Sequence, residues 1–289
     1  MSGVTFVLLY GASYGLVLCL IAIGLVVTMG LMRVVNLAHG AFAAIGGYVA
    51  IGLMQTQGWP YALAVPAAVL AVAALGVVAE RLLYVHLYQR SDLDQVLVTI
   101  GVNFIVVALA TLAFGPNIVR LDLPSALKGN ADIGLREIEV YRLFAAAVCL
   151  LVIALLWWVF ERTNTGARLR AAVDNRGMAQ AIGLNVPRLF SATFALGCGL
   201  AALGGILAAP MLPIEPLWPF KYLVLVLVIV ALSGQGQVRA SVVVALLVGL
   251  VETAGRYLLP EAGGFAIYLL LIALMVWRPD GLLTRRSLA

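Results

Sequence analysis

The chain has 289 residues, of which 64% are hydrophobic and only 11% are charged. This composition excludes an ordinary soluble domain, which is about half apolar and about a quarter charged, because so apolar a surface would aggregate in water. The net charge of +5 does not indicate nucleic-acid binding, since the basic residues lie in short connections between long apolar blocks, as in the cytoplasmic loops of membrane proteins. We therefore expect a multi-pass integral membrane protein.

Nine apolar blocks approach the length of about 20 residues that a helix needs to cross a bilayer. In chain order they cover residues 4–30, 37–55, 60–80, 96–114, 141–160, 190–209, 217–233, 240–258 and 264–277. The seventh block is short, and the segment SGQGQVRAS behind it fits either a cytoplasmic turn or a re-entrant break, so we expect eight or nine spans. The blocks predict an all-α protein in which residues 1–289 form one transmembrane domain.

The stretch VVNLAHGAFAAIGGY, residues 34–48, places polar and small residues where the second span begins. It follows Arg33, so we expect it at the cytoplasmic edge, with the Asn36 side chain capping the helix. His39 then lies on the first turn, either bonding a neighbouring carbonyl at a packed junction or lining the inner end of a passage. Small residues at helical spacing predict close helix packing; they are Gly40, Ala43, Ala44 and Gly47.

Other polar residues within the apolar blocks have two interpretations each. Asn103, one turn after Thr99, either bonds a neighbouring helix or touches substrate. Glu252 and Arg256 are one turn apart and can neutralise each other, either as a packing pair or as a polar patch near the outer mouth. Small residues in the sixth block predict a second close-packing face; they are Gly197, Ala201, Gly204, Gly205 and Ala208. The three cysteines lie in apolar runs without paired spacing, which indicates neither a disulfide framework nor a metal site.

The basic residues predict the orientation, because cytoplasmic loops carry an excess of Lys and Arg. With the 161–188 connection inside, twelve of the 18 basic residues are cytoplasmic: Arg33, Arg81, Arg90, Arg162, Arg168, Arg170, Arg176, Arg188, Arg239, Arg278, Arg285 and Arg286. The N-terminus is then outside and the C-terminus in the cytoplasm. The connection 115–140 is punctuated by Gly and Pro, which predicts a folded external cap.

The connection 161–188 is basic, Ala-rich and helix-prone. Asp174 or Asn175 can cap a short helix, NRGMAQAI, that ends at Gly183 before Pro187. Its apolar face consists of Met178, Ala181 and Ile182, with Arg176 and Gln180 beside it. Two isolated turns are unstable in water, so this face must pack on something, either the membrane surface or a groove in a soluble partner. Small Ala residues around a single Met favour the partner.

Four segments together resemble the permease family of branched-chain amino acid ABC importers, and the smaller, H-type permease in particular: NLAHGAFAAIGGY, RLRAAVDNRGMAQAIGLNV, SATFALGCGLAALGGIL and WRPDGLL. The resemblance extends along essentially the whole chain. It implies that the loop helix is a coupling helix, seated in a cleft of an ATP-binding subunit. The contact residues implied by position are Asp174, Asn175, Arg176, Met178, Ala179, Ile182 and Gly183. Residues 233–237, Ser-Gly-Gln-Gly-Gln, depart from the usual Gly-Gly-x-Gly-Ser pattern.

The resemblance implies a permease subunit of a binding-protein-dependent importer in the bacterial inner membrane, not an enzyme. The cargo would be branched-chain or other hydrophobic amino acids, or related solutes such as urea, amides or aromatic acids. The implied partners are a second permease, two ATP-binding subunits that hold ATP and Mg²⁺, and an external solute-binding protein. This chain lacks a G-x-x-x-x-G-K-[ST] loop and is expected to hold no cofactor. The candidates for the pathway or its helix junctions are Asn36, His39, Gly40, Gly47, Asn103 and Glu252.

The alternative function is a stand-alone, ion-coupled secondary carrier. Such carriers concentrate acidic or His residues near mid-membrane, and this chain is nearly bare of acids there, which counts against proton coupling. A membrane-embedded enzyme is disfavoured because the sequence has neither H-E-x-x-H, nor paired intramembrane aspartates, nor a Ser/His pairing.

Overall fold

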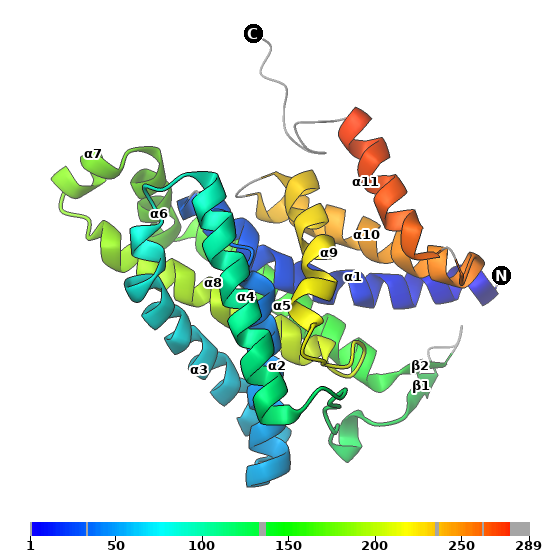
Figure 1. Cartoon of the computed structure of the whole chain (residues 1–289). Helices are drawn as coiled ribbons and strands as arrows, with labels where there is room; N and C mark the ends of the chain where they lie inside the picture. Colours follow the sequence, from blue (N-terminus) through cyan, green and yellow to red (C-terminus); the bar gives the residue numbers. More distant parts are fainter. Residues whose placement is uncertain (1, 33, 133–136, 235–236, 262, 278–289) are drawn as a thin grey trace.

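The structure is a computed structural model that describes residues 2–32, 34–132, 137–234, 237–261 and 263–277. Eleven α-helices contain most of the described residues (Figure 1). They are α1 Ser2–Met32, α2 His39–Gln57, α3 Tyr61–Leu82, α4 Asp92–Phe114, α5 Val140–Arg162, α6 Asn164–Asp174, α7 Arg176–Ala181, α8 Val186–Ala208, α9 Trp218–Ser233, α10 Val238–Leu258 and α11 Ala266–Trp277. Three 3₁₀ turns and one hairpin complete the described part; the turns cover Tyr84–His86, Ser125–Leu127 and Gly263–Phe265.

Nine of these helices coincide, within a few residues, with the nine predicted blocks, and the all-α class is confirmed. Six described helices are long and apolar enough to cross a membrane: α1, α3, α4, α5, α8 and α10. The helices α9 and α11 are apolar but shorter. The structure therefore supports a multi-pass membrane protein, while the count of eight or nine spans and the orientation stay predictions.

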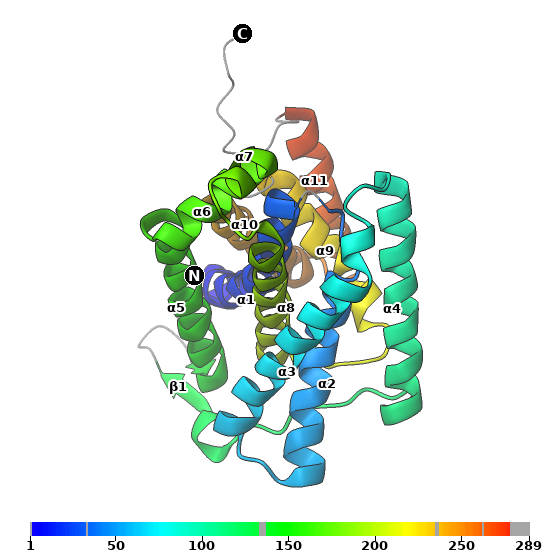
Figure 2. The same ribbon diagram turned by 90° about the vertical axis from the view of Figure 1, so that its left-hand side faces the viewer.

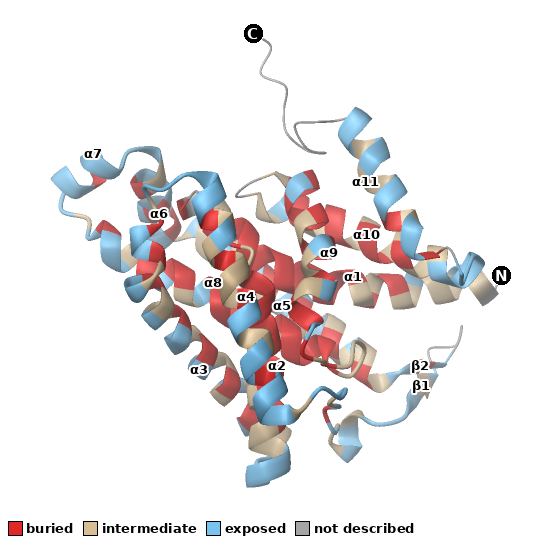
Figure 3. Cartoon of the chain, in the orientation of Figure 1, coloured by how far each residue is buried: buried red, intermediate tan, exposed pale blue. Residues whose placement is uncertain are grey.

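The core forms around α1, which runs through the centre of the molecule and packs on α8 and α10 (Figures 1 and 2). Most side chains of α1 and α8 are buried, whereas only a minority of those on α3, α4 and α5 are buried and the rest are partly or fully exposed (Figure 3). The exposed ones are large and apolar, such as Leu112 on α4 and Leu151 on α5. An apolar surface of this extent suits contact with lipid and not with water.

Small residues allow the central helices to approach closely. A Cβ atom on Gly15 of α1 would lie 2.6 Å from the Ala245 carbonyl oxygen of α10, and one on Gly205 of α8 would overlap the Ala43 carbonyl of α2. The predicted small-residue faces are therefore packing faces. The glycines on α2 have different neighbours: Gly40 faces Pro219 at the start of α9, and Gly47 faces Ile214 in the α8–α9 loop.

The described part of the 115–140 connection contains a 3₁₀ turn and two short strands. Strands β1 Asn130–Asp132 and β2 Glu137–Glu139 form an antiparallel hairpin in which Ala131 pairs with Ile138. Before the hairpin, Val119 exchanges two backbone hydrogen bonds with Ile214, which fastens the connection to the α8–α9 loop. We call this end of the molecule the hairpin end and the opposite one the α7 end. In the predicted orientation, the hairpin end is external.

Candidate functional site

The short helix α7 is built by local capping at the α7 end. Its N-cap is Asn175, whose side-chain oxygen accepts a hydrogen bond from the Met178 backbone N–H at 2.9 Å. Asp174 is the last residue of α6, and it is therefore not the cap. The side chain of Asn175 thus satisfies one of the N–H groups that the first turn leaves without an intrahelical partner.

The other end of α7 is closed by a Schellman motif. The Gly183 N–H donates to the Gln180 carbonyl and the Leu184 N–H donates to the Ala179 carbonyl, each at 3.0 Å. Gly183 has a φ of +86°, a left-handed conformation that glycine adopts without the Cβ clash of other residues. The helix ends at Ala181, close to the predicted stop. Cap and stop together form a two-turn helix where propensity alone would not.

Helix α7 and its C-cap residue carry two large apolar side chains on the surface of the chain. Met178 is 62% exposed and Ile182 is 69% exposed. Asp174, Asn175, Arg176, Ala181 and Gly183 are also exposed. Ala179 differs from the prediction, because its side chain is only 2% exposed and belongs to the core. Successive residues of a helix are turned by about 100° from one another, so Ala179 can face the core while the adjacent Met178 faces outward.

The sequence interpretation missed a polar cluster near the base of α7. Glu80 of α3 is 3% exposed, and its carboxylate accepts hydrogen bonds from the Tyr88 hydroxyl and the Ser191 hydroxyl, both at 2.5 Å. Burial, and then the bond to the carboxylate, raises the pKa of Tyr88 above its ordinary value, so its hydroxyl stays a donor. The Tyr88 ring meets Phe190 edge-on, and the Arg176 guanidinium of α7 lies 5.6 Å from the Phe190 ring centroid. Contacts thus connect α7 to α3 and α8.

Asn36 lies in the extended segment before α2, and its predicted role as the N-cap is wrong. The N-cap is Ala38, which makes no side-chain bond. Instead, the Asn36 side-chain oxygen accepts from the Ala38 N–H at 3.1 Å and from the Tyr84 hydroxyl at 2.8 Å. Asn36 is two residues too early for a cap and forms a local turn typical of Asn. This turn is joined to the 3₁₀ turn after α3.

Side chains on one face of α4 form hydrogen bonds with the backbone of residues 35–37, the segment that precedes α2. The Gln95 side-chain oxygen accepts from the Val35 N–H at 2.8 Å, and the Thr99 hydroxyl oxygen accepts from the Leu37 N–H at 3.2 Å. One turn further on, the Asn103 side-chain N–H donates to the Leu37 carbonyl at 3.0 Å. Asn103 therefore joins α4 to the segment that precedes α2. The spacing of four residues places these three polar side chains on one face of α4; Thr99 and Asn103 were noted from the sequence, and Gln95 was missed.

Replacing Gln95 by Leu is expected to destabilise the fold by about 2 kcal/mol or more. The change leaves the partly buried Val35 N–H without its partner and removes the bonds that Gln95 donates to the carbonyls of Leu87 and Arg90. The melting temperature of the purified protein in detergent should fall by about 5 °C. The exposed neighbour Gln89 provides the control, Gln89→Leu, and equal melting temperatures for the two variants would contradict this account.

His39 is buried at the junction of three helices. Its Nε2–H donates to the Ile21 carbonyl of α1 at 2.9 Å, and its side chain is 1% exposed. The ring occupies space left by Gly24, since a Cβ there would lie 2.8 Å from the His39 Cε1. This is the bonded, packed arrangement that the sequence allowed. Ile21 lies about three turns from the end of α1, so His39 contacts an interior turn of that helix and not its end. The role of His39 in lining or gating a passage stays a prediction.

Glu252 and Arg256 form the expected ion pair at the hairpin end. The Arg256 Nη2 and the Glu252 Oε1 are 2.7 Å apart. Glu252 is 3% exposed, and its second carboxylate oxygen, Oε2, has no hydrogen-bond partner. Both residues line an open cavity of about 850 Å³, whose wall comes mainly from α1, α9, α10 and the α8–α9 loop.

Comparisons with known proteins find relatives along almost the whole chain. A family model described as "Branched-chain amino acid transport system / permease component" matches residues 7–275. The permease protein LivH of the high-affinity branched-chain amino acid transport system of Escherichia coli K12 is 26% identical over 95% of this chain and 94% of its own length. BraD of Pseudomonas aeruginosa is 25% identical (96% and 95%), and LivM of E. coli K12 is 27% identical (94% and 69%). No solved structure matches the chain at comparable significance.

Proposed function

The chain belongs to the family of permease components of branched-chain amino acid transport systems, and from this premise we propose that it is one permease subunit of an ATP-driven importer in a bacterial inner membrane. Its cargo would be branched-chain or other hydrophobic amino acids. It would form half of the pathway, beside a second permease. Two ATP-binding subunits, holding ATP and Mg²⁺, would drive it, and an external solute-binding protein would supply it.

The observation that carries the proposal is the exposed pair Met178 and Ile182 on α7. A capped two-turn helix that presents large apolar side chains, at one end of the molecule (Figure 1), suits insertion into a groove of a soluble partner. Arg176 and Phe190 tether this helix to α8, which packs on α1, α2 and α3. A displacement of α7 would therefore be transmitted through α8 to α1, α2 and α3.

The pairing with a second permease is supported by the relatives. Two permease proteins of one organism, LivH and LivM of E. coli K12, both resemble this chain over most of its length. The secondary-carrier alternative has less support, since the buried carboxylates in the described part are Glu80 and Glu252, which lie at opposite ends of the molecule. Two carboxylates at opposite ends do not make up the continuous series of acidic groups that a proton relay across the membrane needs.

Uptake into proteoliposomes tests the proposal. The chain should be purified with its ATP-binding, permease and solute-binding partners, and labelled leucine should accumulate only with hydrolysable ATP. A protonophore should leave the initial rate unchanged. Uptake that proceeds with a non-hydrolysable ATP analogue and stops with the protonophore would establish the secondary carrier instead.

A further inference from the structure

The cavity at the hairpin end has the dimensions and the wall of a small-molecule site. Its volume of about 850 Å³ falls within the range of about 300–1,000 Å³ found for ligand pockets. Tyrosine rings form much of the wall, including Tyr10, Tyr14 and Tyr222. Apolar side chains from the α8–α9 loop and α9 contribute another part, with Met211 and Leu225 among them. The site would thus offer both polar and apolar contacts to a small amphipathic solute.

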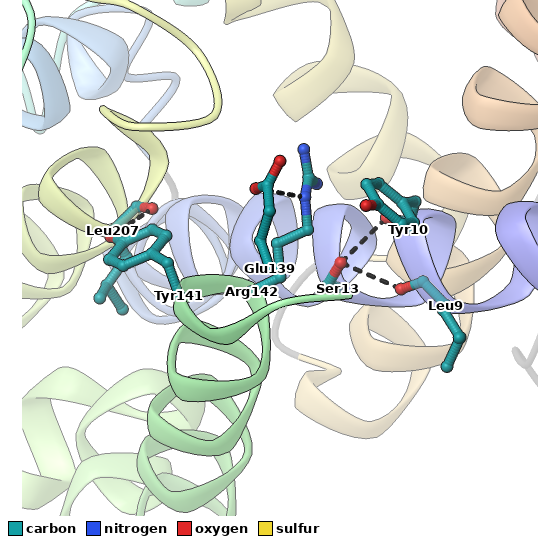
Figure 4. A network of polar contacts seen from close by, with 7 residues as sticks. All are labelled: Leu9, Tyr10, Ser13, Glu139, Tyr141, Arg142 and Leu207. Carbon is teal, nitrogen blue, oxygen red and sulfur yellow. Dashed lines mark hydrogen bonds and ion pairs between the residues drawn. The ribbon is translucent and has the colours of Figure 1, made fainter. Parts of the chain in front are cut away.

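Most of the charged groups in this wall already have partners. Arg142 is 3.0 Å from Glu139 and lies 4.4 Å from the Tyr10 ring centroid (Figure 4). Lys221 is 2.6 Å from Glu215. The same region is braced by the Tyr141 hydroxyl, which donates to the Leu207 carbonyl and fastens α5 to α8 (Figure 4). Arg142 and Lys221 are therefore each already paired with a carboxylate.

Glu252 is different, because only one of its two oxygens is bonded. Arg256 engages Oε1 through two nitrogens, at 2.7 and 2.8 Å, and leaves Oε2 buried without a donor. A buried carboxylate oxygen without a hydrogen bond is costly, and more so than a neutral group. A ligand that donates to Oε2 would remove this cost. The carboxylate can only accept, so the complementary ligand group is a donor, and a cation fits best.

We propose that this cavity binds a zwitterionic amino acid on its way into the membrane pathway, with its α-ammonium group on Glu252 Oε2. The tyrosine rings add cation–π attraction to the same ammonium group. The apolar wall near Met211 and Leu225 receives the aliphatic side chain. The identification of an amino acid as the ligand rests on the proposed import function, whereas the preference for an ammonium group rests on the geometry of Glu252.

Truncated ligands test the ammonium preference on the unaltered protein. The nucleotide-free assembly, without the solute-binding protein, is titrated with L-leucine, with 3-methylbutylamine, which lacks the carboxylate, and with 4-methylpentanoate, which lacks the ammonium group. Saturation-transfer NMR gives each Kd. Leucine and the amine should bind at least about tenfold more tightly than the acid, as expected for a charge-assisted hydrogen bond. Equal binding of the acid, or no binding of any ligand, overturns the proposal.

Three glutamine variants assign the effect to one oxygen. Glu252→Gln should weaken leucine and amine binding about tenfold or more. Arg256→Gln breaks the same ion pair but keeps the carboxylate, so it should retain amine binding, and Glu261→Gln, on the exposed rim of the same wall, should have no effect. Equal losses in the Glu252 and Arg256 variants, or loss of the second permease from the Glu252→Gln assembly, would show a structural pair and overturn the proposal. These results can be distinguished from a failure of the proposed import function, because in that case the unaltered assembly would show no ATP-driven uptake.

Discussion

Replacing Met178 and Ile182 together by aspartate is expected to abolish ATP-driven uptake while the chain stays folded in the membrane. Both side chains are more than half exposed, so their loss should change the free energy of unfolding by about 0.5 kcal/mol or less. In a docked complex each would bury apolar area worth about 1.5–3 kcal/mol. Aspartates there would leave unpaired charges in the groove. The affinity of the ATP-binding subunits should fall at least about a hundredfold, since each 1.4 kcal/mol is a factor of ten.

The matched control for this variant lies in the same loop. Ala167 and Ala171 of α6 are also exposed and also four residues apart, but they are not on α7. Aspartates at these two positions should leave uptake near the wild-type rate. Wild-type uptake by the Met178/Ile182 variant, or an equal loss in the α6 control, would mean that α7 does not couple the chain to its energy source.

Replacing Gly205 by Ala is expected to destabilise the fold by at least about 2 kcal/mol. The added Cβ would overlap the Ala43 carbonyl where α8 crosses α2, so the two helices must separate, and overpacking of this kind usually costs about 1–3 kcal/mol or more. Intrinsic helix propensity predicts the opposite sign, because Ala is favoured over Gly by about 1 kcal/mol within a helix. The sign of the change in melting temperature therefore reports the close approach directly.

Gly101 on α4 is the control for helix propensity. Nothing lies within 4 Å of a Cβ built there, so Gly101→Ala should raise the melting temperature slightly. If Gly205→Ala behaves like Gly101→Ala, then α2 and α8 are not in backbone contact, and the packing of the core described above is incorrect.

Local patterns in the sequence predicted most of the helices, because an apolar block of given length has few alternatives in a bilayer. The same holds for α7, where Asn175 and Gly183 mark both ends through bonds to their near neighbours. The resemblance to the permease family is confirmed by the match over residues 7–275. Two parts of the sequence used in that comparison lie outside the described residues. They are residues 235 and 236, within the segment that departs from the family pattern, and all of WRPDGLL except Trp277.

Contacts between distant segments could not be predicted in the same way. Nothing adjacent to Glu80 in the sequence indicates that Ser191, in another span, donates to it. Likewise, the inward position of Ala179 depends on how α7 sits on the core, and helical spacing alone does not determine that. The position of His39 depends on how α2 packs against α1, whose Ile21 carbonyl it bonds. Each of these features arises from tertiary packing, which a single sequence encodes only indirectly.

Photo-crosslinking from position 178 tests the central claim most directly. Met178→Cys would be labelled with a thiol-reactive benzophenone in the intact assembly, and the native Cys19, Cys149 and Cys198 are all buried, which favours the new thiol. Leu151→Cys, on the apolar outer face of α5, serves as the lipid-facing control. We predict a covalent adduct between position 178 and an ATP-binding subunit, with a yield that changes when ATP is added. Crosslinking of position 178 to lipid alone, as at position 151, would contradict the account.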